Sequence, residues 1–162
     1  MSCVGRDVIG EKGEKILVRN FKGHSGRING QRAIQIIAST GTNRIGEPTA
    51  ALLRTSAVRA AGEFDGSFHY AIDVEYWCRV LLHGDLWVIP APLCAFRVSA
   101  GSWSIQAISS QSRDVCNLLA KLATTPSYQV GWLAWQSGRI RTTINMYLRR
   151  LFYLYFLRRG NT

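Results

Sequence analysis

The segment Ala71-Ile-Asp-Val-Glu-Tyr-Trp-Cys-Arg79 decides how this chain is interpreted. It places the carboxylates of Asp73 and Glu75 among apolar and aromatic residues, in a segment typical of a buried helix. Only ten of the 162 residues are acidic, and burying a carboxylate is costly unless it is paired or hydrogen-bonded. A desolvated carboxylate can serve as a general base. Alternatively, an Asp near a helix start accepts hydrogen bonds from backbone N–H groups.

Strands and short helices alternate on both sides of this segment. The predicted elements are a hairpin within 2–20, a loop over 21–30, a helix over 31–39, a buried strand over 49–54, a short helix through 61, a helix over 72–82 and strands over 86–89 and 93–98. We expect a tight connection at Pro90 and Pro92 to separate the last two strands. The alternation favours an α/β fold.

The chain from about residue 105 onward is predicted to be entirely helical. Its helices are expected over 105–123, 128–136 and 138–159. The pattern therefore divides the chain into a mixed α/β part, 1–104, and a helical C-terminal region, 105–162.

Composition narrows the function classes. The hydrophobic fraction of 47% is enough for a folded core, and the net charge of +10 favours anionic partners. The Lys and Arg residues are scattered without a nucleic-acid-binding motif, so no nucleic-acid partner is predicted. Four widely spaced cysteines argue against a zinc site. The charged, glycine-rich start lacks a secretory signal, which predicts a cytoplasmic protein.

Short motifs follow one another in order from about residue 45 to residue 104. They are Gly46-Glu-Pro-Thr-Ala50, Leu53-Arg54, Ala61-Gly-Glu-Phe-Asp65, Ile72-Asp-Val-Glu-Tyr-Trp-Cys-Arg79, Gly84, Val88-Ile-Pro90 and Phe96-Arg-Val-Ser-Ala-Gly-Ser-Trp-Ser104. The ordered set resembles the acceptor-side half of family 2 glycosyltransferases. The resemblance covers roughly the first two-thirds of the chain.

The resemblance implies part of a GT-A, Rossmann-like fold that transfers a sugar from a nucleotide-sugar donor with inversion, as in polysaccharide synthesis. Asp73 matches the family's catalytic base, and its pKa is expected to rise toward neutrality on desolvation. The implied acceptor- and substrate-binding residues are Gly46, Glu47, Pro48, Glu75, Trp77, Arg97, Ser99 and Ser102.

Three of these side chains have alternative roles. Glu75 could bind acceptor hydroxyls or hold Arg79, since the two are spaced i, i+4 on a helix. Trp77 could be a sugar platform or a core residue. Arg97 could face a diphosphate or pair with Asp73 or Glu75.

The sequence departs from the family pattern in three ways. Ile72 replaces the first acidic residue, and Ser99 replaces a His that helps to hold Mg²⁺ or Mn²⁺, which puts metal use by this half in question. No Asp-x-Asp motif and no donor-binding half are evident. We therefore expect a fragment or truncated form that is inactive alone and needs a partner chain for donor binding. The alternative is a non-catalytic pseudo-enzyme that binds a membrane or a partner.

The segment 138–159 combines basic and aromatic residues. Its apolar run, 151–157, is far shorter than the roughly 20 residues that span a bilayer, and arginine pairs flank it. Such a helix can lie on an anionic membrane surface, which would suit a lipid-linked acceptor. It can equally be a terminal helix packed on the domain. The first alternative predicts peripheral attachment to the cytoplasmic membrane.

Overall fold

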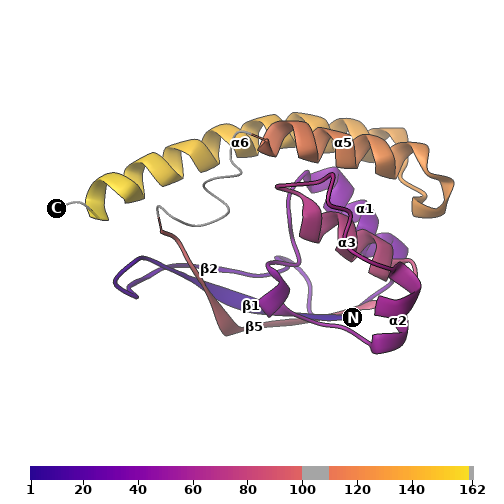
Figure 1. Cartoon of the computed structure of the whole chain (residues 1–162), viewed down its shortest axis with the longest axis horizontal. Helices are drawn as coiled ribbons and strands as arrows, with labels where there is room; N and C mark the ends of the chain where they lie inside the picture. Colours follow the sequence, from indigo (N-terminus) through magenta and orange to yellow (C-terminus); the bar gives the residue numbers. More distant parts are fainter. Residues whose placement is uncertain (100–109, 161–162) are drawn as a thin grey trace.

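A mixed sheet is covered on one face by two layers of helices (Figure 1). The computed structural model describes residues 1–99 and 110–160, and for 149–150 and 152–160 it describes the backbone only. The elements are β1 (Ser2–Ile9), β2 (Lys15–Arg19), β3 (Gly26–Ile28), α1 (Gly30–Thr40), the 3-10 helix η1 (Pro48–Ala50), β4 (Ala51–Leu52), α2 (Thr55–Ala61), α3 (Ile72–Leu81), β5 (Leu86–Arg97), α5 (Gln111–Thr124), η3 (Pro126–Tyr128) and α6 (Trp132–Gly160). In Figure 1, α1 and α3 lie between the sheet and the pair formed by α5 and α6.

The sheet is organised around β1. Its strand order is β2-β1-β5-β3, and β4 pairs with the start of β1. β1 runs parallel to β5 and antiparallel to β2 and β4, while β3 is antiparallel to β5. The parallel pair needs a long crossover, which α1, α2 and α3 provide. The predicted α/β class and the predicted N-terminal hairpin are therefore confirmed.

Two local predictions upstream of α3 hold only in part. The expected strand over 49–54 is shortened to Ala51–Leu52, which pairs with β1, because η1 includes Thr49 and Ala50. Pro48 favours this helical start because its fixed φ suits the first helical position and its missing N–H is not needed there. The expected loop over 21–30 contains the short strand β3, whose partner is β5.

β5 is one continuous strand, whereas the sequence predicted two strands separated at Pro90 and Pro92. Its register against β1 shifts on both sides of Gly5. A Cβ on Gly5 would lie 2.4 Å from the carbonyl oxygen of Pro90 and 2.9 Å from that of Ala91. At this irregular pairing, Pro90 and Pro92 do not have to donate a backbone hydrogen bond to β1, and Gly5 allows the backbones of β1 and β5 to approach closely.

α6 is also continuous, whereas two helices were predicted there. Gly138 marks the point where α6 crosses α1, since a Cβ on it would lie 2.0 Å from the carbonyl oxygen of Ala38. Two side chains of α6 donate hydrogen bonds to carbonyls at the end of α1: Ser137 to Ser39 at 3.1 Å and Asn145 to Thr40 at 3.2 Å. They satisfy carbonyls that a helix end leaves without an intrahelical donor. The Thr142 hydroxyl lies between the carbonyls of Gly138, at 2.8 Å, and Gly41, at 3.3 Å.

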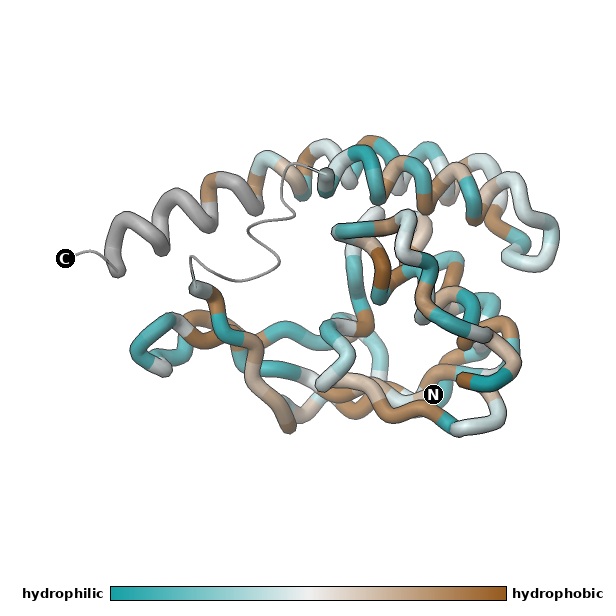
Figure 2. Tube along the Cα trace, in the orientation of Figure 1, coloured by the Kyte–Doolittle hydropathy of each residue, from teal (hydrophilic) through white to brown (hydrophobic). Residues whose placement is uncertain are grey.

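The helices on both sides of residue 104 share one hydrophobic core. α5 contributes Val115, Leu118, Leu119 and Leu122 to the cluster that also contains Trp77. Figure 2 shows hydrophobic residues along the sheet and on the helices that cover it. The predicted boundary near 104 therefore does not separate two cores. The start of the helix predicted over 105–123 lies outside the described residues, and α5 begins at Gln111.

Candidate functional site

Asp73 lies in the first turn of α3 and lines a cavity of about 470 Å³, called here the Asp73 cavity. One wall is apolar and comes mainly from α5, through residues such as Leu118 and Leu122. β1 and the loop after α1 contribute polar side chains to the cavity, among them Arg6, Asn43 and Glu47. A mostly apolar hollow with a few converging polar groups is typical of small-molecule sites.

The environment of Asp73 raises its pKa from 3.8 to about 7. Desolvation is the largest cause, because a charged carboxylate loses its hydration in the cavity wall, and the negative charge of Glu47 adds to the effect. The backbone N–H of Val74, which donates to Asp73 Oδ1 at 2.9 Å, and the charge of Arg6 act in the opposite direction. The expected rise toward neutrality is confirmed, so Asp73 is poised to gain or lose a proton near pH 7.

The loop before η1 fixes the orientation of the Asp73 carboxylate. Asn43 Nδ2 donates to Asp73 Oδ2 at 3.0 Å and to the Gly46 carbonyl at 2.9 Å, and Asn43 Oδ1 accepts from the Gly46 N–H at 2.8 Å. Gly46 has a φ of 117°, and a Cβ there would lie 2.7 Å from Arg6 Nη1. Glycine is therefore required at this position. Gly46 acts on the site through Asn43.

An ion pair on the same side of the cavity joins β1 to the loop. Arg6 Nε lies 2.5 Å from Glu47 Oε2, and the Arg6 side chain is only 3% exposed. Burial lowers the pKa of Arg6, although the charge of Glu47 opposes this. The contact lacks hydrogen-bond alignment, since neither atom has a hydrogen-bond partner among the described residues. Glu47 thus borders the cavity as predicted, but its nearest partner is Arg6.

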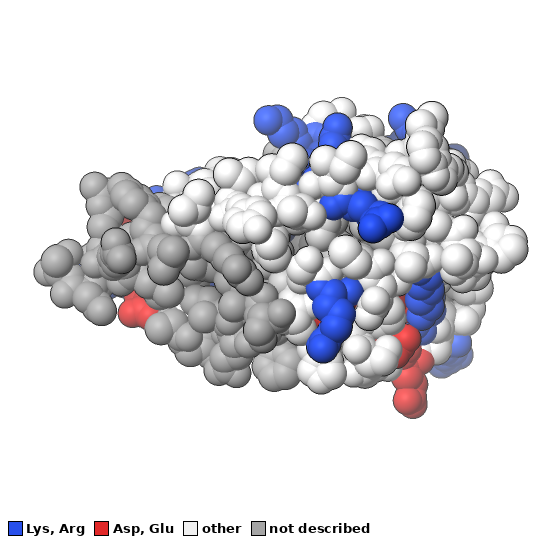
Figure 3. Space-filling model, turned by 90° about the horizontal axis from the view of Figure 1, so that it is seen from above, with Lys and Arg blue, Asp and Glu red and all other residues white. Residues whose placement is uncertain are grey.

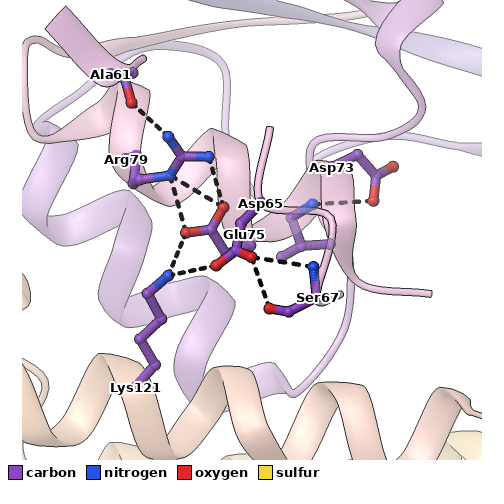
Figure 4. A network of polar contacts seen from close by, with 8 residues as sticks. Ala61, Asp65, Ser67, Asp73, Glu75, Arg79 and Lys121 are labelled. Atoms are coloured by element: carbon purple, nitrogen blue, oxygen red, sulfur yellow. Dashed lines mark hydrogen bonds and ion pairs between the residues drawn. The ribbon is translucent and has the colours of Figure 1, made fainter. Parts of the chain in front are cut away.

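Glu75 is the buried member of a polar network that does not include Asp73 (Figure 4). Its side chain is 1% exposed, and Arg79 binds it through Nε and Nη2 at 2.9–3.0 Å. Lys121 of α5 approaches Glu75 Oε1 to 2.8 Å and Asp65 Oδ2 to 3.2 Å. The predicted pairing of Glu75 with Arg79 is confirmed. The predicted acceptor contact is wrong for this conformation, because both carboxylate oxygens are engaged and shielded from solvent.

Trp77 is a core residue. Its side chain is 2% exposed, and its Nε1 donates to the Gly46 carbonyl at 3.0 Å. The predicted acceptor contact at Trp77 is therefore wrong, and the alternative of a core position is confirmed. Trp77 supports the site indirectly. It holds Gly46, which is hydrogen-bonded to Asn43, and Asn43 orients the Asp73 carboxylate.

The remaining predicted residues lie in different places. Pro48 lines the Asp73 cavity. Arg97 is exposed, and its Nη1 donates to the carbonyls of Gly10 and Glu11 at 3.0 and 2.8 Å, so it contacts neither Asp73 nor Glu75. Ser99 follows β5 and is partly buried. Ser102 lies outside the described residues.

Sequence reasoning missed Asn43 and Arg6. Asn43 lies in a polar loop thirty positions before the carboxylate that it binds, and loops of this composition usually contain turn-forming Asn residues without a site role. Arg6 interrupts an otherwise strand-like pattern, which was the only available signal. A charged residue within a buried strand requires a partner or a function.

No three His, Cys, Asp or Glu side chains gather into a possible metal site within 1–99 and 110–160. In the same part of the chain, no helix has the length and apolar character needed to cross a bilayer. Comparison with protein-family models, curated proteins and solved structures gave no match.

Proposed function

We propose that this chain forms the acceptor side of an inverting glycosyltransferase, with Asp73 as the general base. The observation that supports the proposal best is a carboxylate with a pKa of about 7 that lines a cavity and is oriented by Asn43. A pKa near the working pH gives a base that is deprotonated often enough and still basic enough to act. The order of motifs that resembles the acceptor half of a GT-A enzyme adds independent support.

In the proposed reaction, an acceptor hydroxyl in the Asp73 cavity hydrogen-bonds to the Asp73 carboxylate. Its oxygen forms a bond to the anomeric carbon of the sugar as the bond to the nucleoside diphosphate breaks. The hydroxyl proton passes to Asp73, and the diphosphate leaves with the bonding electron pair. Attack from the face opposite the leaving group inverts the anomeric centre. No metal ligand is assigned among the described residues.

Substitution of Asp73 by Asn tests the assignment. Asp73→Asn keeps the shape of the side chain but cannot accept a proton, so sugar transfer should fall at least about 100-fold. Donor binding, measured by calorimetry, should be unchanged. The measurement is transfer of radiolabelled sugar from a panel of nucleotide-sugars, with protein isolated from its natural host so that any bound partner is retained.

Glu63→Gln is the matched control, because Glu63 is exposed and does not border the Asp73 cavity. Its activity should equal that of the unmodified protein. The unmodified protein should also lose transfer below about pH 7, as Asp73 becomes protonated. Substantial turnover by Asp73→Asn would contradict the base assignment.

A second candidate function, peripheral membrane attachment, is favoured by the unusual orientation of α6. The helix buries small or polar residues, Gly138 and Thr142, against the fold. Its exposed face instead carries an apolar stripe, defined as Ile140, Ile144, Tyr147, Leu148 and Leu151, each more than half exposed. Basic side chains are spread over the helical layer (Figure 3). An apolar stripe beside basic residues suits the surface of an anionic membrane.

A further inference from the structure

A second hollow, of about 410 Å³, adjoins the Asp73 cavity and is called here the basic pocket. Four cationic residues line it: Arg6, Arg19, Lys22 and Arg44. They come from β1, from the end of β2 and from two loops, so the fold brings together charges that are scattered in the sequence. None of the described residues that line this pocket is acidic.

The cations of the basic pocket are incompletely neutralised. Glu47 contacts Arg6, but the buried Nη1 of Arg6 has no hydrogen-bond partner among the described residues. The buried Nε of Arg44 also has no hydrogen-bond partner among the described residues, while Arg44 Nη2 donates to the Lys22 carbonyl at 3.0 Å. Buried donors without partners are costly. A ligand with several acceptor oxygens would remove this cost.

The cations also repel one another. Burial and the neighbouring charge of Arg19 lower the pKa of Arg6, although Glu47 opposes them. Burial and the charge of Arg141 on α6 lower the pKa of Arg44. Such lowering means that positive charge is concentrated where it is poorly hydrated. A bound anion would stabilise the charged form of each group.

We propose that the basic pocket binds a phosphate-bearing ligand, with a phosphate monoester or a diphosphate placed between Arg6, Arg19 and Arg44. Guanidinium groups present paired N–H donors that match phosphate oxygens, and Lys22 adds a point charge. This binding does not require catalysis by Asp73, so it goes beyond the proposed transfer reaction. A diphosphate contact was one of the two alternatives for Arg97, whereas the proposed phosphate site uses a different set of arginines.

The position of the basic pocket determines where the rest of the ligand lies. Arg6 and Asn43 border both hollows, so a ligand whose phosphate occupies the basic pocket can extend into the Asp73 cavity. If the proposed function is correct, the phosphate belongs to a substrate of the transfer reaction. Leu148 of the apolar stripe also lines the basic pocket. The phosphate can therefore come from a soluble molecule or from a lipid headgroup.

Calorimetric titration of the full chain with inorganic pyrophosphate tests the proposal. Arg19→Gln/Lys22→Gln removes two exposed cations of the pocket, which leaves the buried Arg6 and the fold intact. Saturable binding should weaken about tenfold or more in this variant, because each lost charged hydrogen bond is worth about that factor. Arg59→Gln, an exposed charge on α2 away from the pocket, is the matched control and should bind like the unmodified chain.

Vesicle flotation separates the two sources of phosphate. Vesicles of phosphatidic acid in phosphatidylcholine are compared with phosphatidylserine vesicles of equal charge. A lipid source predicts preference for phosphatidic acid, loss of this preference in Arg19→Gln/Lys22→Gln, and competition by pyrophosphate. A soluble source predicts pyrophosphate binding with no such preference. Absence of saturable pyrophosphate binding near physiological salt, or equal weakening in Arg59→Gln, would overturn the proposal, whatever the activity of Asp73→Asn.

Discussion

At the scale of single residues, the site depends on a balance around one carboxylate. Desolvation and Glu47 favour the protonated form of Asp73, while Val74 N–H and Arg6 favour the charged form. The balance leaves the pKa near neutrality, where neither form dominates. Asn43 suits both forms, because its amide donates to a carboxylate oxygen that accepts in either state. Asp73 therefore combines a fixed orientation with a variable charge.

This balance predicts that Asp73 reduces the stability of the folded protein above neutral pH. The folded-state pKa is raised from 3.8 to about 7, so the unfolded chain releases the proton first as pH rises. The stability linked to the protonated form is complete below about pH 4 and is lost by about pH 7. Asp73→Asn should match the unmodified protein near pH 4 and exceed its free energy of unfolding by about 2 to 4 kcal/mol at pH 8. Urea unfolding across this pH range measures both values.

Asp65 gives the control of opposite sign. Hydrogen bonds from Ser67 and Lys121 lower its pKa to about 2. The stability that Asp65 contributes to the fold is therefore present above its unfolded pKa of 3.8 and is lost as pH falls through about 2. Asp65→Asn should lower stability at pH 8, where Asp73→Asn raises it. Equal stability of Asp73→Asn and the unmodified protein at pH 8 would mean that Asp73 remains hydrated in the folded state.

At the scale of elements, α6 approaches the backbone of α1 closely at Gly138, while Trp135 near its start packs against the main core. Gly138 lies against Ala38, and a Cβ on Gly41 would lie 2.4 Å from the Gly138 carbonyl. The hydrogen bonds from Ser137 and Asn145 then satisfy carbonyls at the end of α1. This interface leaves the apolar stripe of α6 on the outside. Apolar residues at helical spacing usually face the core, so their spacing alone does not predict this orientation.

Gly138→Ala distinguishes an integral α6 from an independent terminal helix. In an exposed helix, Ala is more stable than Gly by about 1 kcal/mol. Here the added Cβ would lie 2.0 Å from the Ala38 carbonyl oxygen, and overpacking of this kind costs about 1 to 3 kcal/mol. The free energy of unfolding should therefore fall, as measured by urea denaturation. Gly131→Ala, whose added Cβ would meet no atom within 4 Å, should be nearly neutral. A gain in stability for Gly138→Ala would show that the contact does not form.

At the scale of the whole molecule, local pattern predicted the elements but not how distant segments meet. The hairpin, α1 and α3 follow from turn residues and apolar spacing, and Asp73 stood out because acidic residues are few. Arg6 and Asn43 line both the Asp73 cavity and the basic pocket, and Arg44 lines the basic pocket. These residues come together only when β1 and the loop after α1 meet in the folded chain. The continuous β5 depends on Gly5 opposite its prolines, a contact that no local pattern contains.

The orientation of α6 gives the molecule one face that should attach to membranes. The apolar stripe would enter the headgroup region, and the exposed Arg139 and Arg141 would then lie beside anionic lipid. Ile144→Ser removes apolar area from the centre of the stripe and should weaken flotation with phosphatidylserine vesicles about fivefold to tenfold. Complete burial of an Ile side chain contributes about 1.5 to 3 kcal/mol, and partial burial in the headgroup region contributes less. Leu52→Ser changes an exposed apolar residue on β4, away from the stripe, and should leave flotation unchanged. Equal flotation of all three proteins would mean that the stripe does not contact lipid, and any remaining attraction would then come from charge alone and disappear at high salt.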